Sequence, residues 1–398
     1  MPVSSDTNEQ LLNRARAILR ATPLIDGHND TPWQFRKRTS DRGEQIDFGN
    51  DTRSLVPPMH TDLPRLRRGG LGGQFWSVFV PADMPDGEVV RATVEQFDTV
   101  ACLVERFSRD MELALSAADV RRIHANGCLA ALIGIEGGHS IQGSLGVLRQ
   151  FYRLGARYMT LTHWKNTPWA DAATDVPQHG GLTRFGREVI AEMNRLGMLV
   201  DLSHVAPSTM HQALDASRAP VIFSHSSAFA ICQHVRNVPD DVLKRLAQNG
   251  GVVMVNFAPM FISEEVRRHD LELETLRALH DAAHPNSPEP DRAAQASPTA
   301  SHATPRASLA QVADHIDHIK RVAGVKHIGI GADFDGIEST PLGLEDVSCY
   351  PRLIAELLHR GYTDEEVAGI AGENILRVLG EAERVARATA EAGSPVHG

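Results

Sequence analysis

The sequence lacks the features of disulfide-rich, nucleic-acid-binding and membrane-spanning proteins. Its four cysteines are far apart and form no C-x-x-C pair, which predicts a reduced, cytoplasmic protein without a disulfide framework. The formal net charge is −10 and the longest basic run is Arg36-Lys37-Arg38, so we expect no nucleic-acid partner. No apolar run reaches membrane-spanning length, and residues 1–10 have neither the basic start nor the apolar core of a secretory signal, so we expect no membrane anchor.

What the sequence does contain is apolar runs that alternate with amphipathic stretches. With 398 residues, of which 42% are hydrophobic, the chain can bury a large core. Eight apolar runs have the length of strands: 24–28, 75–80, 129–136, 158–163, 198–204, 220–225, 251–257 and 328–333. Helical patterns occur at 8–21, 89–106, 145–154, 183–196, 208–216, 240–248 and 364–390. Strands that alternate with helices predict parallel βαβ units, and eight of them predict an α/β protein with a (β/α)8 TIM barrel as a single domain over residues 1–398.

One segment interrupts this alternation. Residues 284–308 are rich in Pro, Ala and Ser and have almost no apolar periodicity. A linker between two domains would have a similar composition, but a strand-like run follows at 328–333. We therefore favour an insertion that forms a surface loop within one barrel.

Six of the eight apolar runs end in a polar residue of the kind that binds metal ions or moves protons. These residues are His28, Glu136, His163, His204, His225 and Asp333. Core packing does not explain this arrangement, whereas the active sites of (β/α)8 barrels lie at the carboxyl ends of the strands. The pattern predicts a site at the mouth of the barrel.

Five residues form a candidate metal centre. His28 and Asp30 are an H-x-D pair at the end of the first strand, where both can reach one cation. Such a pair is a weak signal alone, and Glu136, His204 and His225 each have an ordinary explanation as helix-start or loop residues. Their joint position at strand ends favours a divalent-metal site. Imidazole and carboxylate ligands suit Zn²⁺, and two ions about 3.5–4 Å apart, bridged by Glu136, can activate a shared hydroxide for hydrolysis.

Several stretches of the chain resemble the membrane dipeptidase (renal dipeptidase) family, within the wider amidohydrolase-type barrels. The matching stretches are IDGHND at 25–30, GIEGG at 134–138, LTHWKN at 161–166, VDLSH at 200–204, FSHSSA at 223–228, RNVPD at 236–240 and GADFDG at 331–336. The resemblance covers residues 24 to 379, nearly the whole chain. It implies a zinc dipeptidase on a barrel of the metal-dependent hydrolase type.

The resemblance also implies how the metal centre is divided. His28 and Asp30 would hold one zinc ion, and His204 and His225 would hold the other. Glu136 and a water or hydroxide would bridge the two ions of each subunit, which makes Glu136 part of the catalytic set as well as a metal ligand.

Three further residues receive roles in substrate binding and catalysis from the same resemblance. His163 would contact the scissile carbonyl oxygen and stabilise the oxyanion, and Arg236 would bind the C-terminal carboxylate of the substrate. Asp333 would contact the substrate, take a proton from the bridging water and pass it to the leaving amine. Asp335, which has the same parity on its strand, is the rival of Asp333, and Arg236 has an ordinary alternative as a solvated loop residue.

Other aromatic and histidine residues have weaker claims. Trp33 either lines the pocket or packs beneath a loop. His139 is interpreted as a loop or helix-start residue, and His179, His211 and His234 as surface or packing residues.

The expected reaction is hydrolysis of the peptide bond of dipeptides. The resemblance further implies tolerance of a D-residue at the C-terminal position and a homodimer. The alternative is another metal-dependent amidohydrolase or a lactonase that acts on a non-peptide substrate, for which Arg236 would have no carboxylate to bind. A catalytically idle barrel would lack a ligand or the acid/base residue, and this sequence has all of them.

Overall fold

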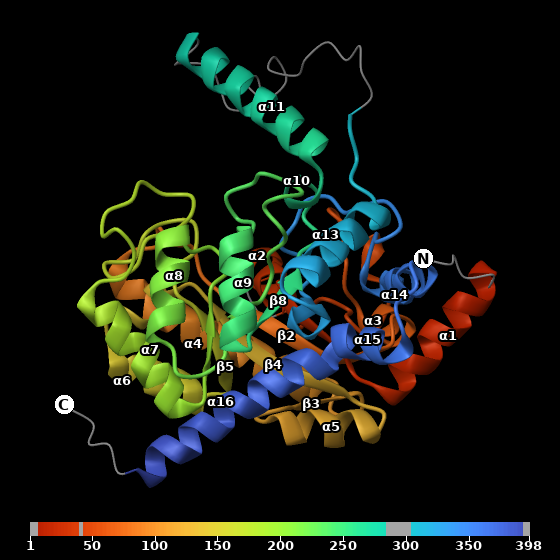
Figure 1. The fold of residues 1–398 in the computed structure, drawn as a ribbon, viewed down its shortest axis with the longest axis horizontal. Helices are drawn as coiled ribbons and strands as arrows, with labels where there is room; N and C mark the ends of the chain where they lie inside the picture. The colour runs from red at the N-terminus through yellow and green to blue at the C-terminus, as the bar shows by residue number, and fades with distance from the viewer. Residues whose placement is uncertain (1–6, 40–42, 284–303, 393–398) are drawn as a thin grey trace.

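Eight parallel strands close into a barrel in the computed structural model, which describes residues 7–39, 43–283 and 304–392 (Figure 1). The strands are β1 (Leu24–Asn29), β2 (Leu71–Phe79), β4 (Leu129–Glu136), β5 (Ala156–Thr160), β6 (Leu199–Asp201), β7 (Ile222–Phe223), β8 (Val252–Val255) and β9 (Ile328–Ile330). Each pairs in parallel with its neighbours, and the β1–β9 and β2–β4 pairings complete the ring. The predicted (β/α)8 TIM barrel is confirmed.

A ninth strand, β3 (Met111–Leu113), lies outside this ring and was not predicted. It pairs with the first half of β4 at Leu129, whereas β5 pairs with the second half of β4 from Ile133 onward. A strand of three residues is too short to show an alternating pattern in the sequence.

The helices surround the barrel, and one of them projects away from the rest of the molecule at the top of Figure 1. The described helices are α1 (Asn8–Ala21), α2 (Thr31–Arg38), α3 (Leu63–Arg68), α4 (Asp86–Arg106), α5 (Ala117–Ala125), α6 (Leu145–Arg153), α7 (Arg184–Leu196), α8 (Pro207–Ala216), α9 (Asp240–Asn249), α10 (Pro259–Ile262), α11 (Glu264–Ala283), α13 (Leu309–Val322), α14 (Tyr350–His359), α15 (Asp364–Ala368) and α16 (Asn374–Glu391). The projecting helix is α11. Within the described ranges, none of these helices combines the length and the apolar character that crossing a membrane requires.

The Pro/Ala/Ser-rich segment lies between α11 and α13. Residues 284–303 of it fall outside the described residues. Its end is marked by Ser308, whose side chain accepts a hydrogen bond from the backbone amide of Gln311, while Oε1 of Gln311 accepts one from the backbone amide of Ser308. This reciprocal capping satisfies two amide groups at the start of α13 and returns the chain to the barrel.

Alternation along the strands divides the core into two layers. Ile25, Phe75, Leu132, Tyr158 and Met254 point into the barrel and pack together. Their sequence neighbours face outward, where they pack against the ring of helices: Leu24, Trp76, Ile133, Met159 and Val255. Ile375 and Leu379 of α16 belong to the inner layer, so α16 closes one end of the barrel. The other end is left for a site.

Close backbone approach inside the barrel requires glycine at particular positions. A Cβ on Gly331 would lie 1.8 Å from the carbonyl oxygen of Ser224, and a Cβ on Gly27 would lie 2.4 Å from the same atom. Because that oxygen belongs to the backbone, it cannot rotate away. The loop that follows β7 is therefore seated directly against β1 and β9.

We expect Gly331→Ala to destabilise the fold by about 1–3 kcal/mol, because the added methyl group overpacks a rigid contact. Gly87→Ala is the matched control: Gly87 lies in the first turn of α4 and its Cβ would meet nothing within 4 Å. Urea unfolding followed by circular dichroism measures both variants. A Gly331→Ala midpoint equal to that of the wild type would contradict the packing described here.

Candidate metal centre

The five predicted ligands lie at or just beyond the carboxyl ends of four barrel strands. His28 is on β1 and Asp30 follows it, while Glu136 is the last residue of β4. His204 lies in the loop after β6 and His225 in the loop after β7. All five are buried, with exposed fractions of 5% or less. The structure brings together the set that the sequence singled out.

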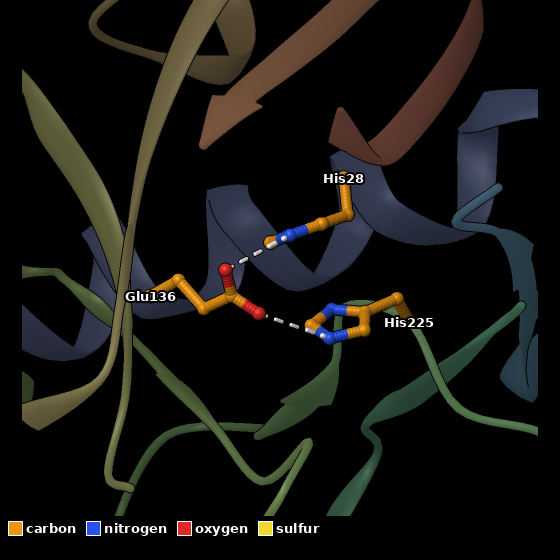
Figure 2. A group of neighbouring side chains, drawn as sticks. All are labelled: His28, Glu136 and His225. Atoms are coloured by element: carbon orange, nitrogen blue, oxygen red, sulfur yellow. Dashed lines mark ion pairs between the residues drawn. The ribbon is translucent and has the colours of Figure 1, made fainter. Parts of the chain in front are cut away.

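The two oxygens of the Glu136 carboxylate face different histidines (Figure 2). Oε2 lies 3.5 Å from Nε2 of His28, whose Nε2 is in turn 3.3 Å from Oδ2 of Asp30. Oε1 lies 3.0 Å from Nε2 of His204 and 3.5 Å from Nε2 of His225. A carboxylate in this position can contact two cations at once, one beside each histidine group.

The polar atoms at this site fit a cation better than they fit one another. Oδ1 of Asp30 is buried without a hydrogen-bond partner, and Nε2 of His28 makes no well-formed hydrogen bond, only carboxylate contacts at 3.3 and 3.5 Å. Nε2 of His204 and Nε2 of His225 are only 2.9 Å apart, and both face Oε1 of Glu136. Unpartnered buried polar atoms are rare in folded proteins, and this nitrogen and oxygen donor set is one that zinc accepts.

Ligand atoms gather in three overlapping groups, each within 4.8 Å. The groups are His28, Glu136 and His225; Glu136, His163 and His204; and His28, Asp30 and Asp333. Glu136 belongs to two of them, which places it at the centre of the site. Distance alone does not separate His163 from the ligands, because its Nε2 is 3.6 Å from Oε1 of Glu136.

Burial sets the charges of the site. It lowers the pKa values of His204 and His225 well below the ordinary histidine value, so both imidazoles are neutral. Burial raises the pKa of Glu136, but His28 and His163 outweigh that effect and hold it well below the ordinary glutamate value. Burial also lowers the pKa of His28, but Tyr158, Glu136 and Asp30 outweigh that effect and raise it well above the ordinary histidine value. Without a cation the site thus surrounds an ionised carboxylate with two neutral imidazoles and a protonated His28, which would lose its proton to a divalent cation on binding.

The backbone is strained at two of these positions. His204 has φ of 71° and Asp333 has φ of 66°, both in the left-handed region. Each costs about 1–3 kcal/mol and persists only where the surroundings impose it. The backbone amide of Asp333 donates to the carbonyl oxygen of His28 at 3.1 Å, and the carbonyl of His204 accepts from Ala173 at 2.7 Å. These contacts hold the loops that aim the two side chains.

Asp333 and its rival Asp335 occupy different surroundings. Asp333 lines the cavity and accepts a hydrogen bond from Nδ2 of Asn256 at 2.9 Å. Burial raises the pKa of Asp333 to about 7, against the opposing effect of His28. Asp335 instead accepts from the hydroxyl of Thr31 at 2.7 Å and holds the adjoining loops together. The position of Asp333 therefore suits the acid/base role better.

A cavity of about 500 Å³ opens over the metal-ligand cluster. His163 lines it, with its ring 4.8 Å from that of Phe79. Burial lowers the pKa of His163 to about 4, so the ring is neutral and can donate one N–H. Trp33 also lines the cavity and packs edge-on against Phe79, which decides between the two interpretations of this residue.

Arg236 brings a buried positive charge to the same cavity. It is 1% exposed, and burial lowers its pKa to about 10, which still leaves it charged near neutral pH. Its guanidinium donates to Oγ of Ser226 and to the carbonyl of His225, both at 3.3 Å, and its Nε has no partner. Among the described residues it forms no ion pair with a carboxylate, so the charge is available to a ligand.

The outer wall of the cavity was not predicted. It comes from one face of α11, which contributes Asp270, Leu273, Glu274 and Arg277 at helical spacing. Asn256 was missed as well, because an asparagine after an apolar run gives no distinct signal.

The other four histidines named in the sequence analysis lie outside the cavity. His139 is in a 3-10 helix (Gly138–Ile141) and contacts the carbonyl of Val80, while His179 contacts the carbonyl of Thr167. His211 pairs with Asp241, and His234 packs against Phe261. These positions agree with the loop, surface and packing interpretations.

Comparison with solved structures gives similar chains over nearly their whole length. The probable dipeptidase PvdM from Pseudomonas aeruginosa is 25% identical, with a TM-score of 0.80, over 95% of this chain and 99% of that chain. A family M19 metallopeptidase, dipeptidase AC, is 26% identical, with a TM-score of 0.72, over 91% and 98% of the two chains. A metallopeptidase from Rhodobacter sphaeroides, liganded with a phosphinate mimic of the dipeptide L-Ala-D-Ala, is 26% identical, with a TM-score of 0.71, over 91% and 99%.

The family comparison covers more of the chain than the motifs do. The model of the membrane dipeptidase family, peptidase family M19, matches residues 12–393, which include every residue of the metal-ligand cluster and the cavity. The chain therefore belongs to the membrane dipeptidase family and is a metallopeptidase, a hydrolase built on a (β/α)8 barrel.

Proposed function

We propose that the protein is a dinuclear zinc dipeptidase. The observation that carries this proposal is the position of Glu136, whose two carboxylate oxygens face separate histidine groups. In this assignment His28 and Asp30 would hold one zinc ion and His204 and His225 the other, with Glu136 as a ligand shared by both. Bound zinc ions would activate a water molecule and polarise the carbonyl group of the peptide bond.

The side chains around the cavity supply the other parts of the reaction. Arg236 binds the C-terminal carboxylate of the dipeptide through its guanidinium, whose Nε has no partner. His163 donates its N–H to the carbonyl oxygen as negative charge develops there. Asp333 takes the proton of the attacking water and transfers it to the nitrogen of the leaving amine, so the C–N bond breaks without release of an amide anion.

We also propose that a D-residue is accepted at the C-terminal position. A similar metallopeptidase, from Rhodobacter sphaeroides, is liganded with a mimic of L-Ala-D-Ala. In this chain the carboxylate would be fixed by Arg236 whatever the configuration of the neighbouring carbon. The homodimer implied by the family resemblance stays a prediction.

We expect His204→Ala to lower both zinc content and dipeptide hydrolysis, because it removes a ligand from one of the two ions. Metal analysis of purified protein should give two zinc ions per chain for the wild type and fewer for the variant. The control is His211→Ala, which changes a partly exposed histidine paired with Asp241 outside the cavity. Two zinc ions and full activity in His204→Ala would contradict the ligand assignment.

We expect Asp333→Asn to lower kcat by about 10²–10⁴-fold with little change in KM, because an amide cannot carry the proton to the leaving amine. Asp335→Asn is the matched comparison, since it makes the same chemical change two residues away. That variant should lower the midpoint of thermal unfolding, through weaker contacts to Thr31 and His60, and keep most of kcat. The reverse outcome would assign the acid/base role to Asp335.

We expect Arg236→Met to lower kcat/KM for L-Ala-L-Ala and L-Ala-D-Ala by at least about 30-fold, since loss of one partner of a buried charge pair costs 2–5 kcal/mol. The C-terminally amidated dipeptides provide the control. They should be poor substrates of the wild type and lose little more in the variant. An equal loss for the acids and the amides would show that Arg236 does not bind the substrate carboxylate. It would favour the alternative, a metal-dependent amidohydrolase or lactonase for uncharged substrates.

A further inference from the structure

A chain of hydrogen bonds reaches the metal-ligand cluster from inside the barrel. Asp201 is the last residue of β6 and is fully buried. Its Oδ2 accepts from the hydroxyl of Ser224 at 2.6 Å, and Oγ of Ser224 lies 2.7 Å from Nδ1 of His225. No sequence pattern assigned a role to Asp201 or Ser224.

The four hydrogen bonds on Asp201 fix the direction of this chain. Oδ1 accepts from the backbone amides of Ser203 at 3.1 Å and Ser224 at 2.9 Å. Oδ2 accepts from the hydroxyls of Thr160 at 2.7 Å and Ser224. Because an ionised carboxylate can only accept hydrogen bonds, the Ser224 hydroxyl has to use its only proton to donate to Asp201.

This arrangement determines which ring nitrogen of His225 carries the proton. Since the Ser224 oxygen can only accept on its remaining side, Nδ1 of His225 has to carry the proton. Nε2 then carries the lone pair, and Nε2 is the atom that faces Glu136 at 3.5 Å and His204 at 2.9 Å. A histidine ligand is competent only when the nitrogen that faces the metal is unprotonated.

The geometry points to Asp201 as a positioning residue of the metal centre, which acts through Ser224 to hold His225 in the Nδ1-protonated tautomer. His28 is held in a similar way, with its Nδ1 2.8 Å from the hydroxyl of Tyr158, whose proton goes to the carbonyl of Gly27 at 3.1 Å. Nδ1 of His204, by contrast, is buried without a partner. The assignment rests on the metal centre of the proposed function and concerns how that centre is preorganised.

Asp201→Asn is the informative substitution because it keeps the size of the side chain. The two backbone amides that face Oδ1 cannot turn, so the asparagine oxygen has to occupy that side. Its NH₂ group then faces the Ser224 hydroxyl and donates to it. The Ser224 hydroxyl can then donate its hydrogen bond to Nδ1 of His225, which favours the ring tautomer with the proton on Nε2 and so blocks the nitrogen that would face a metal ion.

The tautomer is measured directly from ¹⁵N-histidine spectra of the full-length protein before and after chelation, with the His225 signals identified by their loss in His225→Gln. We expect an Nδ1-protonated ring in the wild type and an Nε2-protonated ring in chelated Asp201→Asn. Competition with a chromophoric chelator should show zinc affinity about 10–100-fold lower in Asp201→Asn.

Thr160→Val is the matched control, because it removes a hydrogen bond from the same oxygen of Asp201 but leaves Ser224 in place. It should lower the unfolding midpoint and keep both the tautomer and the zinc affinity of the wild type. If Asp201→Asn does not fold, Ser224→Ala tests the same chain, and the wild-type spectrum decides without any variant.

An Nε2-protonated His225 in the chelated wild type would overturn the assignment. So would unchanged zinc affinity in Asp201→Asn, or an equal loss in Thr160→Val, which would mark Asp201 as structural only. A wild-type protein that binds no zinc but has the Nδ1-protonated ring would instead overturn the proposed function and leave the orientation of His225 established.

Discussion

The buried carboxylate of Glu136 is the group on which the rest of the site depends. Together with Asp30 and Asp333 it places three acidic side chains at the mouth of a barrel. Removing an ion from water costs several kcal/mol even after the protein relaxes, and that cost is recovered only by opposite charge at short range. Arg236 is the one buried guanidinium that lines the cavity within the described part of the chain. The family's metal dependence therefore has a physical basis in this chain: bound cations would balance negative charge that the fold has already buried.

Side chains inside the barrel position the charged groups of the site. A Cβ on Gly134 would lie 1.9 Å from the ring of Tyr158, so the ring occupies space that only glycine leaves open. That space lets the Tyr158 hydroxyl reach Nδ1 of His28 from inside the barrel. Asp26, deeper in the same strand, accepts from the hydroxyl of Tyr350 and from the backbone amide of His28. The residues beneath the site thus orient the ligands. The geometry of the metal-ligand cluster therefore depends on how the inner layer of the barrel packs.

The sequence predicted the barrel and the gathering of the ligands because both follow from periodicity. Apolar runs give the strands, and a polar residue at the end of a run marks the mouth. It did not predict that β7 is only two residues long, with His225 in the loop beyond it, or that His204 adopts a left-handed backbone. Those features depend on contacts between loops that are distant in sequence.

The roles of two further kinds of residue could not be predicted from the sequence. The helix α11 exposes Leu271, Leu276 and Leu279. Its sequence therefore lacks the single apolar face that predicts a helix packed on a core. Ser224 has no distinguishing composition, since a hydroxyl near a histidine is common in any loop. Only the distances among side chains reveal that it connects Asp201 to the ligand cluster.

One peptide group connects the metal-ligand cluster to the side chains proposed to bind substrate, and this connection would make a site of this kind selective for dipeptides. The carbonyl oxygen of His225 accepts from Arg236 at 3.3 Å and from Asn256 at 3.4 Å, and Asn256 also donates to Asp333. The groups to which we assign carboxylate binding, proton transfer and metal coordination are therefore held at fixed separations. One additional residue would move the C-terminal carboxylate of a substrate by about 3.5 Å, which exceeds the tolerance of a hydrogen bond. A tripeptide placed for cleavage at its first bond would leave the Arg236 charge buried and unpaired, so the contact proposed to secure a dipeptide would also reject longer chains.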